Sequence, residues 1–409
     1  MLPPLPPVLD ETLHRLWRLL PTGGRRALLS QATALIAPIA DRNPAKPAHG
    51  LAIAGEFSRS SQSGDAARLM AAAAASLGVA SWRLDIPPIL GRMADREAPR
   101  DAPPPAGAPL VVHMNPPLLP LALLRLPHQL SRGRRVIGYW SHEMPVVPRD
   151  WRIGARFVHE VWTASRYAAA AMEPLLPGRV RVVPPAVAED PPEPSSLDRA
   201  AFGLPDDAVV VLASVDFADS FTRENPLGTI AAFQTAFGDR RDRILVLRIA
   251  HYDQAPGDFG QLRLAARAAN IRLETRPMPA GDHHALTLCA DIVLALHHAT
   301  GFGMEMAWAM LLGKPVIATK WSGNLDYMDN DNAVLIGSTL TEAPDRRGNM
   351  RGIAWAEPDI SEAVAQLRRL ADDVQARRML GERAKASARM TLTSAPLADA
   401  LRELGVLDL

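Results

Sequence analysis

The stretch from residue 291 to residue 332 constrains the fold of this chain more than any other segment. It begins with an apolar run at residues 292–296, which predicts a short buried strand. The tripeptide GFG at residues 301–303 then interrupts the chain, and residues 304–312 have the composition of a helix. A second apolar run at residues 316–318 predicts another strand. Two strands joined by a helix form a right-handed parallel unit, so the stretch indicates an α/β fold.

The same unit indicates where a ligand would bind. Ligands of parallel sheets bind beyond the carboxyl ends of the strands, and here those ends lead into residues 297–303 and 320–324. The first backbone N–H groups of the 304–312 helix have no partner within the helix and carry partial positive charge. They therefore suit an anion such as a pyrophosphate.

A chain of 409 residues is long enough for two domains, and its 48% hydrophobic content can supply two cores. The formal net charge of +1 provides no electrostatic field for nucleic acid, so nucleic acid is not expected as a partner. The single cysteine, Cys289, rules out an internal disulfide and fits a reducing compartment. We find neither a run of about 20 apolar residues nor a secretory signal, so neither a membrane span nor export is expected.

The alternation of strands and helices runs through both halves of the chain. A proline-rich segment at residues 184–196, PPAVAEDPPEPSS, separates the halves and predicts a stiff linker. The first half has apolar runs at residues 51–54, 82–86, 110–112, 136–140 and 180–183, and the second has them at 209–215, 244–249 and 272–277. The predicted organisation is a helical preface (1–48), a first Rossmann-like domain (49–190), a linker (191–200), a second Rossmann-like domain (201–390) and a C-terminal helix (391–409).

The preface contains a basic amphipathic pattern. Over residues 9–38, leucines and Trp17 alternate with arginines. A basic amphipathic helix can lie on an anionic membrane surface. It can also pack its apolar face on the first domain, which is the favoured interpretation.

Several motifs, spread over both halves, agree with one known family. The second half carries GFG at residues 301–303, LLGKPVIAT at 311–319 and WSGNLDYM at 321–328. The first half carries GYWSHEMP at residues 138–145 and EVWTASR at 160–166. In these motifs the chain resembles retaining glycosyltransferases of the GT-B fold, of the family 4 type, in a branch that builds bacterial surface polysaccharides. The match is too long and too ordered to be a chance glycine pattern.

The resemblance implies an α/β fold of the GT-B type, with two Rossmann-like domains facing a cleft and a C-terminal helix that crosses back to the first domain. It implies transfer of a sugar, with retained configuration, from a UDP- or GDP-linked donor on the second domain. The acceptor, a polyprenyl-linked or polysaccharide glycan, would lie on the first domain. It also implies a cytoplasmic protein that can contact the inner face of the cytoplasmic membrane.

No cofactor and no metal are expected. The histidine pairs at residues 283–284 and 297–298 lack cysteine or glutamate partners at the spacing of zinc ligands.

For the reaction itself we single out three residues: His113 and Glu143 from the resemblance, and Glu305 from its place on the 304–312 helix. His113 would face the donor sugar, Glu143 would act as a base towards the acceptor hydroxyl, and Glu305 would stand near the donor. From the residues alone, His113 is equally well a strand-end histidine bonded to backbone, and Glu143 a charge at a helix N-terminus. The implied donor-binding residues are Arg223, Arg248, His297, Thr300, Gly301, Phe302, Gly303, Ser322, Gly323 and Asn324, and the implied cleft loop of the first domain contains Ser63 and Gly64.

The chain departs from the family pattern at three positions. The two glutamates that hold the donor sugar and the ribose fall on Thr300 and Trp308, and the lysine that contacts the diphosphate falls on Glu224. Trp308 cannot accept a hydrogen bond. Arg223 is adjacent to the lost lysine, and a guanidinium binds phosphate well. Glu305 lies one helical turn before Trp308. Two alternatives are open for it: it replaces a family glutamate for a shifted donor, or it is a solvated surface charge.

These departures leave two main hypotheses. In the first, the chain is an active glycosyltransferase, which is favoured because the GFG turn, the SGN loop, His113 and Glu143 are retained. In the second, it is a catalytically degenerate GT-B protein that serves as a binding or scaffold subunit of a polysaccharide assembly system. A nucleotide-sugar epimerase of the same fold is less favoured, because its cleft would need more titratable groups.

Overall fold

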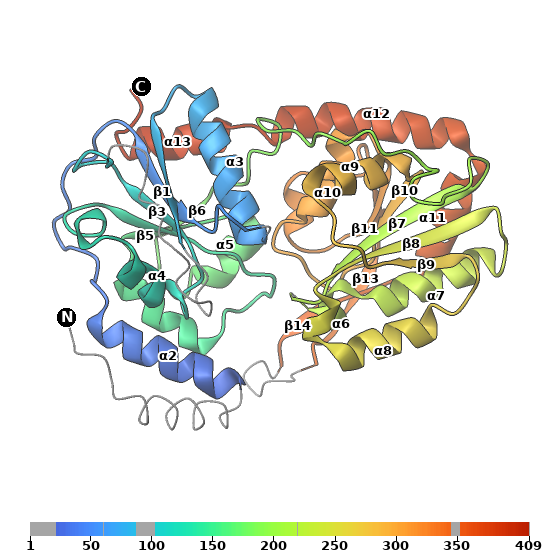
Figure 1. Ribbon diagram of the computed structural model, residues 1–409, viewed down its shortest axis with the longest axis horizontal. Coiled ribbons are helices and arrows are strands. Elements are labelled where there is room, and N and C mark those ends of the chain that lie inside the picture. The colour runs from blue at the N-terminus through green and yellow to red at the C-terminus, as the bar shows by residue number, and fades with distance from the viewer. Residues whose placement is uncertain (1–21, 60, 87–102, 219, 345–351, 409) are drawn as a thin grey trace.

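The computed structural model describes residues 22–59, 61–86, 103–218, 220–344 and 352–408. It consists of two α/β halves that lie side by side (Figure 1). Each half is built on a six-stranded sheet, and all strands paired within these two sheets are parallel. The prediction of two Rossmann-like domains is therefore confirmed.

The first sheet has the strand order β2-β1-β3-β4-β5-β6. Strands β1, β3 and β4 bury every residue, as expected for a parallel sheet that is covered on both faces. The strands are β1 (Leu51–Gly55), β2 (Ser81–Asp85), β3 (Leu110–His113), β4 (Val136–Tyr139), β5 (Glu160–Thr163) and β6 (Val180–Val182).

Helix α3 (Gln62–Ser76) packs closely on this sheet because its inner face is made of alanines. Ala67, Ala71 and Ala74 are fully buried, and a Cβ added to Gly55 would lie only 2.7 Å from the Cβ of Ala67. The other helical segments of this half are α2 (Thr22–Ile36), α4 (Leu119–Arg125), the 3₁₀ segments η1 (His128–Leu130) and η2 (Arg149–Arg156), and α5 (Arg166–Met172).

The second sheet has the strand order β12-β11-β10-β7-β8-β9. The predicted unit at residues 291–332 forms β10 and β11 with α10 between them, and the two strands are parallel neighbours. The boundary predicted near residue 190 falls between β6 and β7. The strands are β7 (Val209–Asp216), β8 (Arg243–Ala250), β9 (Ile271–Glu274), β10 (Ile292–Ala295), β11 (Val316–Thr319) and β12 (Val334–Ile336).

The helices of the second half come from the segments between these strands and after them. An antiparallel hairpin, β13 (Ser338–Glu342) with β14 (Ala354–Pro358), follows β12. The helices are α6 (Phe221–Glu224), α7 (Pro226–Phe237), α8 (Pro256–Ala265), α9 (Ala280–Cys289), α10 (Met304–Leu311), α11 (Ile360–Asp372) and α12 (Val374–Thr391), with the 3₁₀ segments η3 (Tyr252–Gln254) and η4 (Gly323–Asp326).

The C-terminal helix, α13 (Ala395–Glu403), returns to the first half (Figure 1). Leu397, Ala400 and Leu401 are buried there in one cluster with the inner face of α3. The predicted crossing back is therefore confirmed. Where the chain crosses, the backbone N–H of Ala188 donates to the carbonyl of Leu392 at 2.9 Å, which ties the two interdomain segments together.

The described part of the preface is α2, which packs on the first half. Thr33, Ala34 and Ala37 are buried, and α2 contacts α4 and η2. The last residues of α2, Leu35 and Ile36, are exposed. The earlier part of the predicted basic helix, residues 9–21, lies outside the described residues. Among the described helices, none combines the length and the apolar character needed to cross a bilayer.

Helices α10 and α12 approach each other at two glycines. A Cβ added to Gly381, in α12, would run into the carbonyl oxygen of Gly313, which follows α10. Gly313 has φ = 75°, a left-handed conformation that closes the end of α10 and that glycine adopts without strain. The position of α10, whose other end faces the first domain, thus depends on a backbone contact.

We predict that Gly381→Ala destabilises the protein by about 1–3 kcal/mol, because the added methyl group overpacks this contact and outweighs the gain in helix propensity. The matched control is Gly260→Ala in α8, where an added Cβ meets nothing within 4 Å; it should leave stability unchanged or raise it. Thermal and urea unfolding of both variants give the comparison. Equal stability of Gly381→Ala and the wild type would contradict this account of the helix contact.

Candidate functional site

The segments that follow the carboxyl ends of the strands meet at the boundary between the two halves. The Ser165 hydroxyl, after β5, donates to the carbonyl oxygen of Gly301, after β10, at 2.5 Å. Ser165 also caps α5 by accepting a hydrogen bond from the backbone of Ala168 at 3.2 Å. Asp326, in η4, accepts hydrogen bonds from the backbone N–H of Arg166 at 2.7 Å and from its Nε at 3.1 Å. The predicted donor site therefore faces the first domain.

The donor loop, residues 297–303, is held tightly by the residues after β11. The backbone N–H of Thr300 donates to the Ser322 hydroxyl at 2.8 Å, and the N–H of Gly323 donates to the Thr300 carbonyl at 2.9 Å. A Cβ on Gly323 would run into the carbonyl of Gly301, so only glycine fits. The side-chain amide of Asn324 donates to the Thr319 carbonyl at 3.1 Å and fixes the start of this turn.

The GFG turn leads directly into the N-terminus of α10. Gly303 has φ = 87° and no side chain caps the helix. The Tyr327 hydroxyl lies 3.0 Å from the carbonyl oxygen of Phe302 and 2.8 Å from that of Gly303. The Gly303 carbonyl also accepts the first hydrogen bonds of the helix, from the backbone N–H groups of Met306 at 3.0 Å and Ala307 at 3.1 Å. Tyr327 therefore fixes the turn from which α10 begins, and the first N–H groups of the helix carry partial positive charge.

Glu305, in the first turn of α10, belongs to a cluster of polar side chains from three other elements. Its carboxylate lies 2.9 Å from Nε2 of His283 and 3.7 Å from the guanidinium of Arg248. The Ser214 hydroxyl donates to it at 3.5 Å. We call these four residues the Glu305 cluster. Burial alone would raise the pKa of Glu305, but the positive charges of His283 and Arg248 outweigh burial and lower it to about 2.

The first domain approaches this cluster through the N-terminus of α3. Burial raises the pKa of Asp65, against the lowering effect of its partner Arg68, and the negative charge of Glu305 contributes to the rise. The carboxylates of Asp65 and Glu305 therefore face the same region from opposite halves of the molecule.

Trp308, where the sequence resemblance places a second glutamate, packs against two histidines of α9. Its ring centroid lies 6.0 Å from that of His283 and 5.3 Å from that of His284, with both pairs edge to face. Both histidines lie in α9, which begins at Ala280. The helix brings His283 to Glu305, a partnership that sequence spacing does not reveal.

Arg223 is buried beneath the donor loop. Its Nη1 donates to the carbonyl oxygen of Ala299 at 2.6 Å and its Nη2 to the carboxylate of Glu224 at 3.1 Å. Only 6% of its side chain is exposed. Its guanidinium therefore supports the loop backbone, and these contacts do not include Glu305. Arg248, with 20% of its side chain exposed, is the cation that lies beside Glu305 and the start of α10.

The two histidines of the donor loop are fixed by their surroundings. The ring nitrogens of His297 lie 3.1 Å and 3.2 Å from the carbonyl oxygens of Ala295 and Trp321, and burial lowers its pKa to about 4. His298 is bonded to the carbonyl of Thr222 at 2.7 Å. It also stacks on a tryptophan of β14. Both side chains therefore brace the loop.

His113 ends β3 and is buried, with only 1% of its surface exposed. Its ring stacks on Tyr139 at 4.5 Å. Neither ring nitrogen has a hydrogen-bond partner among the described residues. Burial lowers the pKa of His113 to about 3, so the imidazole is neutral at physiological pH. The sequence alternative of a histidine satisfied by backbone is therefore wrong for its side chain.

The predicted first-domain loop lies next to His113. The Ser63 hydroxyl donates to the backbone carbonyl of His113 at 2.8 Å, and Gly64 donates its N–H to the N-cap residue Ser61 at 3.1 Å. Glu143 lies at the domain boundary, since a Cβ added to Gly301 would be 3.7 Å from its Cγ. The structure thus brings Glu143 to the GFG turn.

Sequence reasoning missed the roles of Ser165, Arg166, His283 and Ser214. The first two are visible in the EVWTASR motif, where a serine after a strand predicts a helix cap. Their partners, however, lie in the other half of the chain. His283 and Ser214 have no sequence signal that links them to Glu305.

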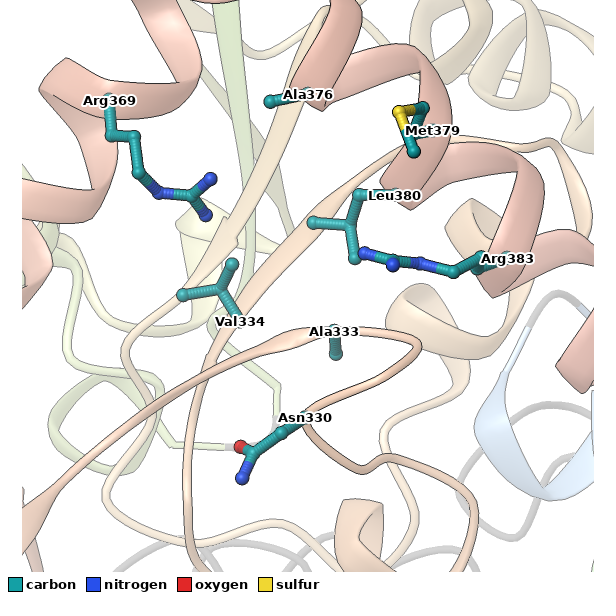
Figure 2. Close-up of a pocket in the computed structure, with 8 residues that line it drawn as sticks. All are labelled: Asn330, Ala333, Val334, Arg369, Ala376, Met379, Leu380 and Arg383. Atoms are coloured by element: carbon teal, nitrogen blue, oxygen red, sulfur yellow. The ribbon is translucent and has the colours of Figure 1, made fainter.

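No group of three or more His, Cys, Asp or Glu side chains in the described part of the chain is arranged to hold a metal ion. The cavity in Figure 2, of about 220 Å³, lies away from the site, between Val334 of β12 and the arginines Arg369 and Arg383 of α11 and α12.

Comparison with known proteins gives structural likenesses only. No family model matches the chain, and no curated protein matches it in sequence. The structure of Anabaena HepE in complex with UDP-glucose is similar over 88% of this chain and 100% of that chain, with a TM-score of 0.59 and 14% identity. Sucrose-phosphate synthase from Thermosynechococcus elongatus is similar over 87% and 99%, with a TM-score of 0.60 and 14% identity. A glycosyltransferase from Rickettsia africae is similar over 87% and 98%, with a TM-score of 0.58 and 10% identity.

Together with the two parallel sheets and the returning C-terminal helix, these likenesses show that the chain has the GT-B fold. The predicted fold class is therefore confirmed.

Because His113 is buried in its neutral form, the stability of the protein should depend on pH. The unfolded chain binds a proton at His113 below about pH 6.5, whereas the folded protein does not until about pH 3. Stability therefore falls as the pH falls from about 6.5 towards 3. We predict that His113→Phe, which retains the stacking on Tyr139, reduces this slope by about 1.4 kcal/mol per pH unit.

Urea unfolding at pH 7.5, 6.0 and 5.0 measures the slope for both proteins. Between pH 7.5 and 8.5 the difference between wild type and His113→Phe should stay constant, which serves as the internal control. The same slope in both proteins between pH 6.0 and 5.0 would show that His113 is not held neutral by burial.

Proposed function

We propose that the protein is a glycosyltransferase. It takes a sugar from a nucleotide-sugar donor, UDP- or GDP-linked, and transfers it with retention of configuration to a polyprenyl-linked or polysaccharide acceptor. The donor binds to the second domain and the acceptor to the first. The proposed enzyme uses neither a cofactor nor a metal.

The observation that carries this proposal is the uncapped N-terminus of α10 beside Arg248. The GFG turn presents the positive end of the helix to the domain boundary. Arg248 lies at the carboxyl end of β8 and shares the partner Glu305 with that helix turn. A helix N-terminus and a guanidinium together stabilise the negative charge that develops on a departing nucleoside diphosphate. Arg248, in place of Arg223, is therefore the proposed diphosphate-binding cation.

Glu305 is the proposed replacement for the family's donor glutamate. As a carboxylate it accepts hydrogen bonds from sugar or ribose hydroxyls. Its low pKa keeps it ionised, so it is always an acceptor. Trp308, which now packs on His283 and His284, supplies an apolar wall where the family has a second acceptor.

The first domain contributes two groups to the proposed reaction. The neutral His113 can donate one hydrogen bond and accept another, and both of its nitrogens lack protein partners in the described structure. Glu143, next to Gly301, is the proposed general base for the acceptor hydroxyl. The Ser165 bond to Gly301 connects the acceptor side to the donor loop.

The donor class has support from the relatives in structure. HepE is described in complex with UDP-glucose, and that complex aligns with most of this chain. A UDP-linked sugar is therefore the proposed donor of this chain, and a GDP-linked sugar is the alternative.

The acceptor and the location complete the proposal. The exposed face at the end of α2 carries Leu35, Ile36 and Ile39, with 83%, 71% and 60% of their surfaces exposed. Such a face suits peripheral contact with the inner face of the cytoplasmic membrane. A lipid-linked acceptor would be reached there by a cytoplasmic enzyme.

A second function, that of a degenerate GT-B scaffold subunit, has its own supporting observation. Trp308 fills space beside the Glu305 cluster, and Arg223 is committed to the Ala299 carbonyl. Both departures remove groups that the family uses for the donor. A protein of this kind would bind a partner transferase instead of turning over a donor.

We predict that isothermal titration detects binding of one nucleotide among UDP, GDP, UDP-glucose and GDP-mannose, and that Arg248→Ala weakens it about 10- to 100-fold. The reason is the loss of a hydrogen bond to a charged phosphate, about 1.5–3 kcal/mol. The matched control is Arg240→Ala, an exposed arginine that pairs with Asp242 just before β8, at the opposite end of that strand. It should bind as the wild type does.

Donor turnover separates the two functions. Release of free nucleoside diphosphate from the bound donor by the wild type, together with loss of that release in Glu305→Gln, supports the transferase. No binding of any of the four nucleotides at millimolar concentration contradicts the proposal, and binding without turnover in the presence of membrane extracts favours the scaffold.

A further inference from the structure

A second cavity lies at the crossing between the two halves, away from the proposed donor site. Its volume is about 560 Å³, within the range of about 300–1,000 Å³ of small-molecule sites. The linker, α9, the end of α10 and α12 form its walls. The two segments that join the halves are bonded to each other at its edge, through Ala188 and Leu392.

The cavity wall is apolar on most sides. The linker contributes prolines between residues 191 and 194, which have no N–H group to satisfy. Leu288 of α9, with 42% of its surface exposed, and Leu311 and Leu312 at the end of α10 form the facing side. Leu288 is the most exposed of these leucines, and an apolar ligand in the cavity would remove its surface from water.

The remaining wall is basic. Lys385 and Arg389 lie four residues apart in α12 and therefore on the same face of the helix. No acidic residue lines the cavity, and no ion pair in the described part of the chain involves either residue. The aliphatic side chain of Lys385 lies beside Gly313, since a Cβ added to Gly313 would be 3.6 Å from its Cδ. Gly313 follows the C-terminal end of α10, where the helix dipole is negative. Arg389, one turn further, lies in the last turn of α12, where the dipole of that helix also favours a cation. Two cations thus line the cavity without an acidic residue between them, so an anion there would reduce their mutual repulsion.

We propose that this cavity binds an anionic amphiphile: an apolar chain of medium length with a carboxylate or phosphate head. The chain would lie against the prolines and leucines, and the head would lie between Lys385 and Arg389. The proposal goes beyond the glycosyltransferase function and does not rest on it, because the cavity contains none of the donor-site residues. Since both interdomain segments border the cavity, its occupant would contact the hinge.

The first test is calorimetric titration of the full chain with octanoate, decanoate and decyl phosphate below their micelle concentrations, with decanol and inorganic phosphate as partial ligands. Binding should tighten about fourfold for each added methylene group, as expected for apolar burial. Decanol and inorganic phosphate should each bind at least about tenfold more weakly than decanoate. Bound decanoate should also raise the melting temperature, because it binds the folded state.

Two variants locate the ligand. The double variant Lys385→Gln/Arg389→Gln should weaken decanoate about tenfold or more and leave decanol unchanged. Leu288→Trp should prevent binding of both decanoate and decanol, because the larger side chain fills the cavity. Residue 288 is half-exposed, so the substitution should not disturb folding. The matched control is Arg383→Gln in the same helix, whose side chain lines the other cavity (Figure 2), and it should bind decanoate as the wild type does.

Several results would overturn the proposal. These are no binding of decanoate or decyl phosphate at 1 mM, equal affinity for decanol and decanoate, or equal loss of binding in Arg383→Gln. Binding to vesicles of anionic lipid without binding of monomeric amphiphile would also overturn it, because that result assigns the charge to a membrane surface. Tighter binding of either decanoate or decyl phosphate supports the proposal, and the one that binds more tightly identifies the head group.

Discussion

The hydrogen bonds that hold the Gly301 carbonyl and its neighbours are the constraint on which the site depends. The donor loop leaves β10 and must turn sharply before α10 can begin. Ser322 and Gly323 hold it from within the second domain, and Ser165 holds it from the first. Because the loop is bonded on both sides, the start of α10 has a fixed position relative to both domains. A preorganised array of backbone dipoles is what an anionic leaving group requires.

Around the positions where the sequence departs from the motifs it resembles, the structure has its own network of charges. Arg223 has turned inward to the Ala299 carbonyl, where it supports the loop. Arg248 and His283 instead hold the carboxylate of Glu305 at the start of α10. A carboxylate and a cation are thus both present beside the helix N-terminus, although neither stands where the family motif places it. This is the physical reason for favouring a working donor site over a degenerate one.

Much of the fold was predictable, because apolar runs, glycines and prolines act locally. The unit around α10 and the proline-rich linker follow from such signals, whereas the return of helix α13 to the first half was implied by the resemblance. The partners of Glu305 were not predictable, because they come from β7, β8 and α9, which only the tertiary fold brings together. The direction of the Arg223 side chain was also hidden, since its acceptor is a backbone carbonyl and carries no sequence signal. His113 was identified by resemblance, but its burial, which sets its pKa, is a property of the packed sheet.

The proposed function requires that the donor loop and the start of α10 form a nucleotide-sugar site. Hydrogen–deuterium exchange, with and without saturating UDP-glucose or GDP-mannose, tests it most directly, because a bound diphosphate would cover the first N–H groups of α10. We expect slowed exchange in residues 297–308 and at the end of β8, with α11 unchanged. Unchanged exchange in residues 297–308, with or without protection elsewhere, would contradict it.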